Sequence, residues 1–313
     1  MNIRKILVPV DFSEYSNTAL EYGLLWGETF GAELTLLHVN TLFHEHYDYD
    51  RMMQSYRGIV EKEREQLHRW MEAHAARAAE REVQFRYEIL DGRSAAQTIL
   101  QYLKANSFDL VIIGTHGRSG IKHLLLGSVA EKVSRLSPYP VLTTHKDVEK
   151  FQVKNILVPV DFSDYSRQAT RIAVDIAREF DARIHLLHVF ERANAAHFQW
   201  IPETVRIQFD INPDVRERIL TELKTYKDDT IPHWSLEVVE EGLAYREIIT
   251  YAEEHEIDLI VMATRGLNKF EYFWMWGSST ERVVRLAPCP VLTIRWQETS
   301  REGEAVQVRE TTV

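Results

Sequence analysis

Two segments of the first half carry residue types suited to binding an anionic ligand. Asp11 directly follows the apolar run at 6–10, and the glycine-rich stretch GTHGRSG occupies residues 114–120. Gly127 and Ser128 then stand where a helix is predicted to begin, so their backbone N–H groups are expected to face the ligand. Helix starts favour anions, and glycines let the backbone approach closely. The Ser128 hydroxyl adds a donor, and Asp11 offers an acceptor for a ribose hydroxyl or a base amine.

Both features also have simpler explanations. Glycine in a strand-to-helix loop often serves only the turn, and aspartate after a strand often only caps a helix. The chain contains neither G-x4-G-K-[ST] nor G-x-G-x2-G, so Walker-type hydrolysis and dinucleotide binding are not predicted.

The histidines are candidates of a different kind. His116 adjoins the glycine-rich loop and could steady a phosphate, or it is simply an exposed loop histidine. A general base would need an orienting partner, which the sequence does not identify. His38 and His188 occupy equivalent places near a strand end, which favours a structural hydrogen bond. The segment HEHYDYD at 44–50 has no helix-spaced histidine pair or cysteine, so no metal site is predicted.

An internal repeat sets the architecture. The octapeptide ILVPVDFS occurs at 6–13 and again at 156–163, an offset of 150 residues. The same offset relates LLHV at 36–39 to LLHV at 186–189, and PVLT at 140–143 to PVLT at 290–293. Matches in one order over both halves indicate a duplicated domain. We expect domains at 1–146 and 153–296, followed by a disordered tail at 297–313.

Each half alternates strand and helix patterns. The continuous apolar run at 6–10 is typical of a strand buried on both faces, whereas alternation at 83–89 predicts a half-exposed edge strand. A long polar helix is predicted over 51–80. These patterns predict an α/β fold of two tandem, doubly wound, five-stranded parallel sheets with strand order 3-2-1-4-5. Ligands of such sheets bind where the strand order reverses, beyond the carboxyl ends of strands 1 and 4.

The glycine spacing completes a family resemblance. Gly114, Gly117, Gly127 and Ser128 match G-x2-G-x9-G-[ST], and with the VPVD, LLHV and PVL segments the chain resembles the universal stress protein family (UspA-like), in its tandem two-domain form. The resemblance implies an adenine nucleotide alpha hydrolase-like fold that binds ATP, with or without Mg. It implies that Asp11 and the Val39 backbone hold the adenosine, that Gly114 permits the turn, and that the other three residues hold the phosphates. The equivalent, weaker set in the second copy is Asp161, Val189, Gly266, Gly277 and Ser278.

The second copy departs from this motif. Ala263 replaces Gly114, and ten residues rather than nine separate Gly266 from Gly277. Phosphate loops depend on backbone placement, so the first copy is predicted to be the better nucleotide site. The large apolar side chains at 270–276 are expected to pack on protein or to line an apolar ligand. The resemblance implies that the last strands, at 140–144 and 290–294, pair the halves as an internal pseudo-dimer, with a homodimer also open.

Composition limits the remaining functions. The chain has 313 residues, a net charge of −10 and a single cysteine, Cys289. An acidic chain without a basic run is not expected to bind nucleic acid, and one cysteine allows no internal disulfide. No apolar run is long enough for a signal peptide or a membrane span, so a cytoplasmic location is expected. Cys289 is expected to be a packed thiol. The resemblance implies a stress-response function exerted through binding rather than catalysis, with a scaffold or apolar-ligand binder and a slow ATPase as alternatives.

Overall fold

A computed structural model describes residues 1–41, 49–116, 126–145, 151–190, 213–239, 242–264 and 278–295, with all their side chains except those at 49–64, 213–215 and 278. The predicted tail and most of the segment at 44–50 lie outside these residues. The large apolar side chains at 270–276 in the second copy also lie outside them.

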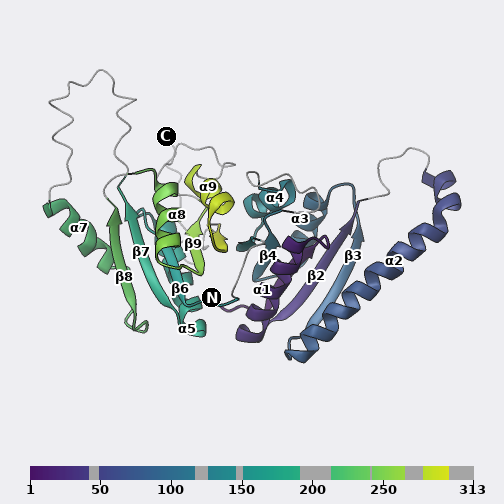
Figure 1. The fold of residues 1–313 in the computed structure, drawn as a ribbon, viewed down its shortest axis with the longest axis horizontal. Helices are drawn as coiled ribbons and strands as arrows, with labels where there is room; N and C mark the ends of the chain where they lie inside the picture. Colours follow the sequence, from purple (N-terminus) through teal and green to yellow (C-terminus); the bar gives the residue numbers. More distant parts are fainter. Residues whose placement is uncertain are drawn as a thin grey trace, which may run out of the picture.

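The first half is a parallel sheet flanked by helices (Figure 1). Its strands are β1 (Lys5–Val10), β2 (Glu33–Asn40), β3 (Phe85–Asp91), β4 (Leu110–Gly114) and β5 (Val141–Thr144). Its helices are α1 (Glu14–Phe30), α2 (Tyr49–Glu80), α3 (Ala95–Ala105) and α4 (Ser128–Leu136).

The second half repeats this arrangement. Its strands are β6 (Asn155–Pro159), β7 (Arg183–Val189), β8 (Trp234–Val239), β9 (Leu259–Ala263) and β10 (Val291–Ile294). Its helices are α5 (Asp164–Phe180), α7 (Pro213–Lys224), α8 (Ala244–Glu254) and α9 (Ser278–Leu286).

All ten strands belong to one continuous sheet. Their order is β3-β2-β1-β4-β5-β10-β9-β6-β7-β8, which confirms the predicted order 3-2-1-4-5 in each half. Every pairing within a half is parallel, and the β5–β10 pairing is antiparallel. The predicted association of the two halves through their last strands is therefore confirmed.

Local sequence explains where the elements begin and end. Ile6, Leu7 and Val8 have no solvent exposure, as expected for a central strand covered on both faces. Ser13 caps α1, because its side chain accepts a hydrogen bond from the Ser16 N–H. The edge strand β3 begins at Phe85, two residues later than predicted. Val83 packs against α1 instead, so closely that a Cβ added to Gly27 would lie 2.8 Å from the Val83 Cγ1.

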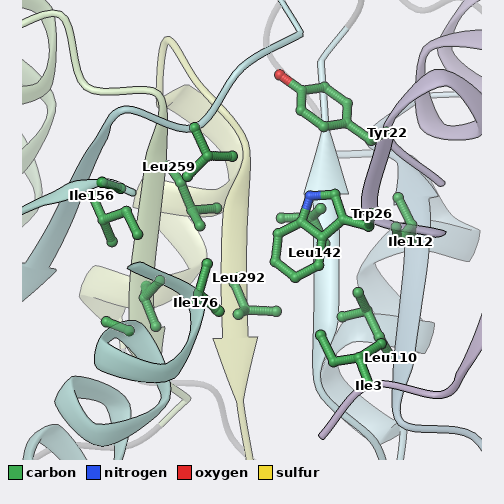
Figure 2. Packing of buried hydrophobic residues seen from close by; sticks show 14 of the residues in the cluster. Ile3, Tyr22, Trp26, Leu110, Ile112, Leu142, Ile156, Ile176, Leu259 and Leu292 are labelled. Atoms are coloured by element: carbon green, nitrogen blue, oxygen red, sulfur yellow. The ribbon is translucent and has the colours of Figure 1, made fainter. Parts of the chain in front are cut away.

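The two halves share a buried seam. Leu142 pairs with Leu292 across the β5–β10 junction, and both side chains are fully buried. The Thr143 hydroxyl donates to the Val291 carbonyl over 3.1 Å. Figure 2 shows Leu142 and Leu292 on neighbouring strands, with the Trp26 indole close to Leu142.

Aromatic packing between helices extends the seam. The Trp26 ring of α1 lies 5.5 Å from the Phe180 ring of α5, and Phe30 lies 5.8 Å from Phe180. A single hydrophobic cluster contains residues of both halves. Within the described part of the chain, none of the helices combines the length and apolar character that crossing a membrane requires.

Candidate functional site

The carboxyl ends of β1 and β4 meet at the predicted switch point. These strands are neighbours in the sheet, with Ile6 opposite Leu110 and Leu7 opposite Val111. Asp11 therefore follows β1 at the same sheet edge where Thr115 and His116 follow β4. The structure thus brings together the two segments that the sequence singled out.

Asp11 already performs a structural task at this edge. Its Oδ1 accepts hydrogen bonds from the Ser13 N–H at 3.1 Å and the Ser13 hydroxyl at 2.6 Å. Asp161 makes the same two bonds to Ser163 in the second copy. The capping explanation therefore holds for one carboxylate oxygen. A carboxylate has about four lone-pair sites, so it can also accept from a ligand hydroxyl.

The residue after each aspartate adopts an unusual backbone conformation. Phe12 has φ +66° and Phe162 has φ +63°, a left-handed region that bulky side chains rarely occupy. Packing holds Phe12 there, with its ring 4.5 Å from the His38 ring and 4.3 Å from the Trp70 ring. Sequence analysis missed this feature. The DFS tripeptide repeated at both strand-to-helix junctions is the signal that could have revealed it.

Gly127 caps the start of α4, and its N–H bonds to protein rather than facing a ligand. Its N–H donates to the Thr115 carbonyl over 2.7 Å, so the prediction that this N–H is directed at a ligand is wrong. A Cβ on Gly127 would lie 3.0 Å from that same carbonyl oxygen. The first hydrogen bond inside the helix runs from Glu131 to Gly127, which leaves the N–H groups at 128–130 without an intrahelical acceptor. Ser128, the first helical residue, is exposed.

Gly114 is required for close packing and not for a turn. Its φ is not positive, and a Cβ there would lie 2.7 Å from the Tyr15 carbonyl oxygen of α1. The expected reason for this glycine, a special turn conformation, is therefore wrong. Ala263 carries this additional Cβ in the second copy, and its carbonyl accepts a hydrogen bond from the Thr280 hydroxyl of α9 over 3.1 Å.

His116 is half-buried and held in place, which rules out the exposed-loop interpretation. Its Nδ1 lies 3.2 Å from the Thr115 hydroxyl, and its ring centroid lies 4.9 Å from that of Tyr15. Its Nε2 is shielded from solvent and has no hydrogen-bond partner among the residues that the structure describes. Thr115 is thus the orienting partner that the sequence could not identify.

His38, near the end of β2, and His188, near the end of β7, make structural hydrogen bonds, as predicted. His38 Nδ1 lies 2.8 Å from the Val10 carbonyl, and His188 Nδ1 lies 2.7 Å from the Val160 carbonyl. Burial lowers the pKa of His188, so its neutral form is favoured. Val39 lies at the end of β2, beside this bond, and is 9% exposed.

The structure does not describe all of the candidate residues. Gly117, Gly266 and Gly277 lie outside the described residues, as does the side chain of Ser278. Asp161 stands two residues after the end of β6, and Val189 is the last residue of β7. The predicted difference between the two loops therefore remains a prediction.

Other candidate features do not enlarge the site. Among the residues that the structure describes, no group of three His, Cys, Asp or Glu could hold a metal. Cys289 is buried, and burial raises the pKa of its thiol, which confirms the packed-thiol prediction. A cavity of about 400 Å³ lies near the amino ends of β2 and β3, and its lining includes Gly31, Glu82 and Gln84.

The fold and site define a tandem α/β protein with a candidate anion-binding helix start in its first half. The family model described as the universal stress protein family matches residues 2–145 and 152–295. This chain belongs to the universal stress protein family.

Individual relatives agree with this assignment. The chain is 33% identical over 145 residues to universal stress protein MJ0531 of Methanocaldococcus jannaschii, a match that covers 45% of this chain and 82% of that protein. It is 34% identical over 146 residues to universal stress protein YxiE of Bacillus subtilis, covering 44% of this chain and 96% of that protein.

Solved structures share this fold over nearly the whole chain. A universal stress protein from Archaeoglobus fulgidus superimposes with a TM-score of 0.66 at 22% identity, covering 94% of this chain and 99% of that one. A putative universal stress protein from Pseudomonas aeruginosa superimposes with a TM-score of 0.60 at 19% identity, covering 94% and 93%.

Proposed function

We propose that this chain is a cytoplasmic stress-response protein that binds ATP, with or without Mg, mainly in its first half. It acts through binding rather than catalysis, and residues 1–146 and 153–296 form its two domains. The observation that carries the proposal is the start of α4. There, the backbone N–H groups at 128–130 have no intrahelical acceptor, and the buried His116 Nε2 has no hydrogen-bond partner within the described part of the chain.

The residues at this edge fit a nucleotide. The exposed Ser128 hydroxyl and the N–H groups at 128–130 are donors, which a phosphate chain requires. Across the switch point, Asp11 can accept a hydrogen bond from a ribose hydroxyl while it holds Ser13. When bound, ATP would supply a charged ligand whose presence or loss changes the conformation or partners of the protein. Gly117 and the Val39 backbone complete the proposed contacts.

Calorimetric titration of the full chain with Mg-ATP tests this proposal. We expect one tight site per chain. Gly127→Val should weaken it at least about tenfold, since even the Cβ would lie 3.0 Å from the Thr115 carbonyl and the valine branches would distort the entrance to α4. Gly277→Val is the matched control in the second copy and should leave the tight site intact.

Circular dichroism must show that Gly127→Val remains folded. Absence of heat from wild-type protein in millimolar Mg-ATP would refute the proposed function. Two sites of equal affinity, lost independently in the two variants, would refute the preference for the first half. Release of phosphate from ATP at a rate lost in Gly127→Val would instead favour the slow ATPase.

A further inference from the structure

A cavity of about 400 Å³ lies where the C-terminal ends of α1 and α2 come together. Figure 1 shows both helices ending at the lower edge of the first half. The lining combines two buried apolar residues, Ala32 and Val83, with three exposed carboxylates, those of Glu28, Glu80 and Glu82. Cavities of roughly 300–1,000 Å³ are the size that small organic ligands occupy.

The glutamates stand where helix electrostatics favour the opposite charge. The last turn of a helix presents unpaired carbonyls and a partial negative charge, so cations are stabilising there. Helix α1 has no basic residue in its last turn and carries Glu28 instead. Glu80 is the last residue of α2. The cations nearest in the chain, Arg77 and Arg81, both pair with Glu21. Within the described part of the chain, none of the three lining glutamates forms an ion pair.

The second half shows what occupies the equivalent junction there. Arg178, in the last turn of α5, stands 150 residues after Glu28. Its Nε donates to the Thr230 hydroxyl over 2.8 Å, and its Nη1 donates to Asp175 over 3.1 Å. Its Nη2 lies 3.2 Å from both carboxylate oxygens of Asp228. A guanidinium group therefore joins the end of this helix to the chain that enters the edge strand.

The first half lacks both parts of that arrangement. Asp228 and Thr230 belong to a connection that spans 225–233 between α7 and β8, whereas only residues 81–84 connect α2 to β3. The first half has a glutamate in place of the arginine and a shorter connection. It therefore retains carboxylates and a cavity at the junction that an internal guanidinium holds in the second half.

We infer that this cavity binds a small organic cation that carries a guanidinium group on an aliphatic stem. A guanidinium has five N–H donors in a planar fork, which suits several carboxylates placed around it. Ala32 and Val83 offer apolar contact to the stem. The cavity adjoins the amino ends of β2 and β3, whereas Asp11 follows the carboxyl end of β1. The site is thus separate from the proposed ATP site.

Calorimetric titration of the full chain with propylguanidinium chloride tests this inference. We expect one saturable site with a Kd of about 1 mM, since the probe is small and the carboxylates are exposed. Propylurea has a similar shape without the charge and should not bind saturably. Raising the sodium chloride concentration from about 0.05 M to about 0.5 M should weaken binding several-fold, because salt screens exposed charges.

Three variants locate the binding. The double variant Glu28→Gln with Glu82→Gln keeps the side-chain sizes and removes two charges, so it should bind the probe at least about fivefold more weakly. Glu28→Arg installs the residue of the second half and should abolish binding. Glu254→Gln, at an exposed glutamate of α8, is the matched control and should bind as wild type does. Circular dichroism checks that each variant is folded.

The inference would be overturned by absence of saturable binding to the wild-type chain at up to about 20 mM probe. Equal binding of propylurea, or undiminished binding in the folded double variant, would also overturn it. Equal weakening in Glu254→Gln would show that the probe responds to the overall negative charge of the chain and not to the cavity, which refutes the site. Failure of the ATP titration would leave this site standing, because the two sites lie at opposite ends of the strands.

Discussion

At the scale of single residues, His185 makes the stability of the second half depend on pH. It lies on β7 and is 5% exposed, with Nδ1 3.1 Å from the Tyr251 hydroxyl of α8. Burial, together with the positive charges of His255 and Arg183, lowers the pKa of His185 from 6.5 to about 4. His255 in turn stacks on Tyr251, with ring centroids 3.8 Å apart.

Acid should therefore destabilise this half. Between pH 6.5 and pH 4 the unfolded chain binds a proton at His185 that the folded chain does not, so stability is complete above this window and falls as pH drops through it, by about 3 kcal/mol in total. Urea unfolding at a series of pH values measures the effect. His185→Thr, which installs the residue found at the equivalent position Thr35, should remove this part of the pH dependence. An unchanged pH profile in that variant would contradict the assignment.

At the scale of elements, the repeat provides a natural comparison of two helix ends. Helix α1 ends at Gly31 with φ +62°, and α5 ends at the equivalent Asp181 with φ +51°. Left-handed backbone suits glycine and strains other residues. A Cβ added at Gly31 would meet no atom within 4 Å, so any cost of substitution there is conformational.

We expect Asp181→Gly to raise the free energy of unfolding by roughly 0.5–1 kcal/mol and Gly31→Asp to lower it by a similar amount. Gly31→Asn should cost less than Gly31→Ala, because asparagine tolerates this conformation. Chemical denaturation of each variant is the measurement. A stabilising effect of Gly31→Ala would show that the helix end is not under this constraint.

At the scale of the whole molecule, the continuous sheet predicts that the two halves unfold together. Leu142 and Leu292 are fully buried opposite each other at the seam, and Trp26 contacts Phe180 across it. Leu142→Ala should lower the free energy of unfolding by about 2–5 kcal/mol and weaken the coupling between the two halves. Differential scanning calorimetry should then resolve two unfolding transitions. Leu37→Ala, at a leucine 1% exposed within the first half, is the control and should lower one shared transition. A single transition in both variants would mean that the seam is not what couples the halves.

Much of this architecture follows from the sequence alone. The identical octapeptides at 6–13 and 156–163 established the duplication. Alternating strand and helix patterns, with an edge-like third strand, predicted the strand order and therefore the switch point. These features could be read directly because periodicity and repeats are local properties of the chain. Pairing through the last strands was predicted from the family resemblance, and the structure bears it out.

Only the tertiary structure decided what the individual site residues do. Gly114 is needed because Tyr15 approaches from another element, and the Gly127 N–H is already bonded to Thr115. His116 is oriented by the Thr115 hydroxyl, which bonds to Thr144 of β5, and Phe12 is held by the distant Trp70. Apart from the contact between the neighbours Thr115 and His116, these contacts join residues that are not adjacent in the chain, so neither spacing nor composition reveals them. The sequence determined which residues gather at the switch point, and packing determined which of their atoms remain available to a ligand.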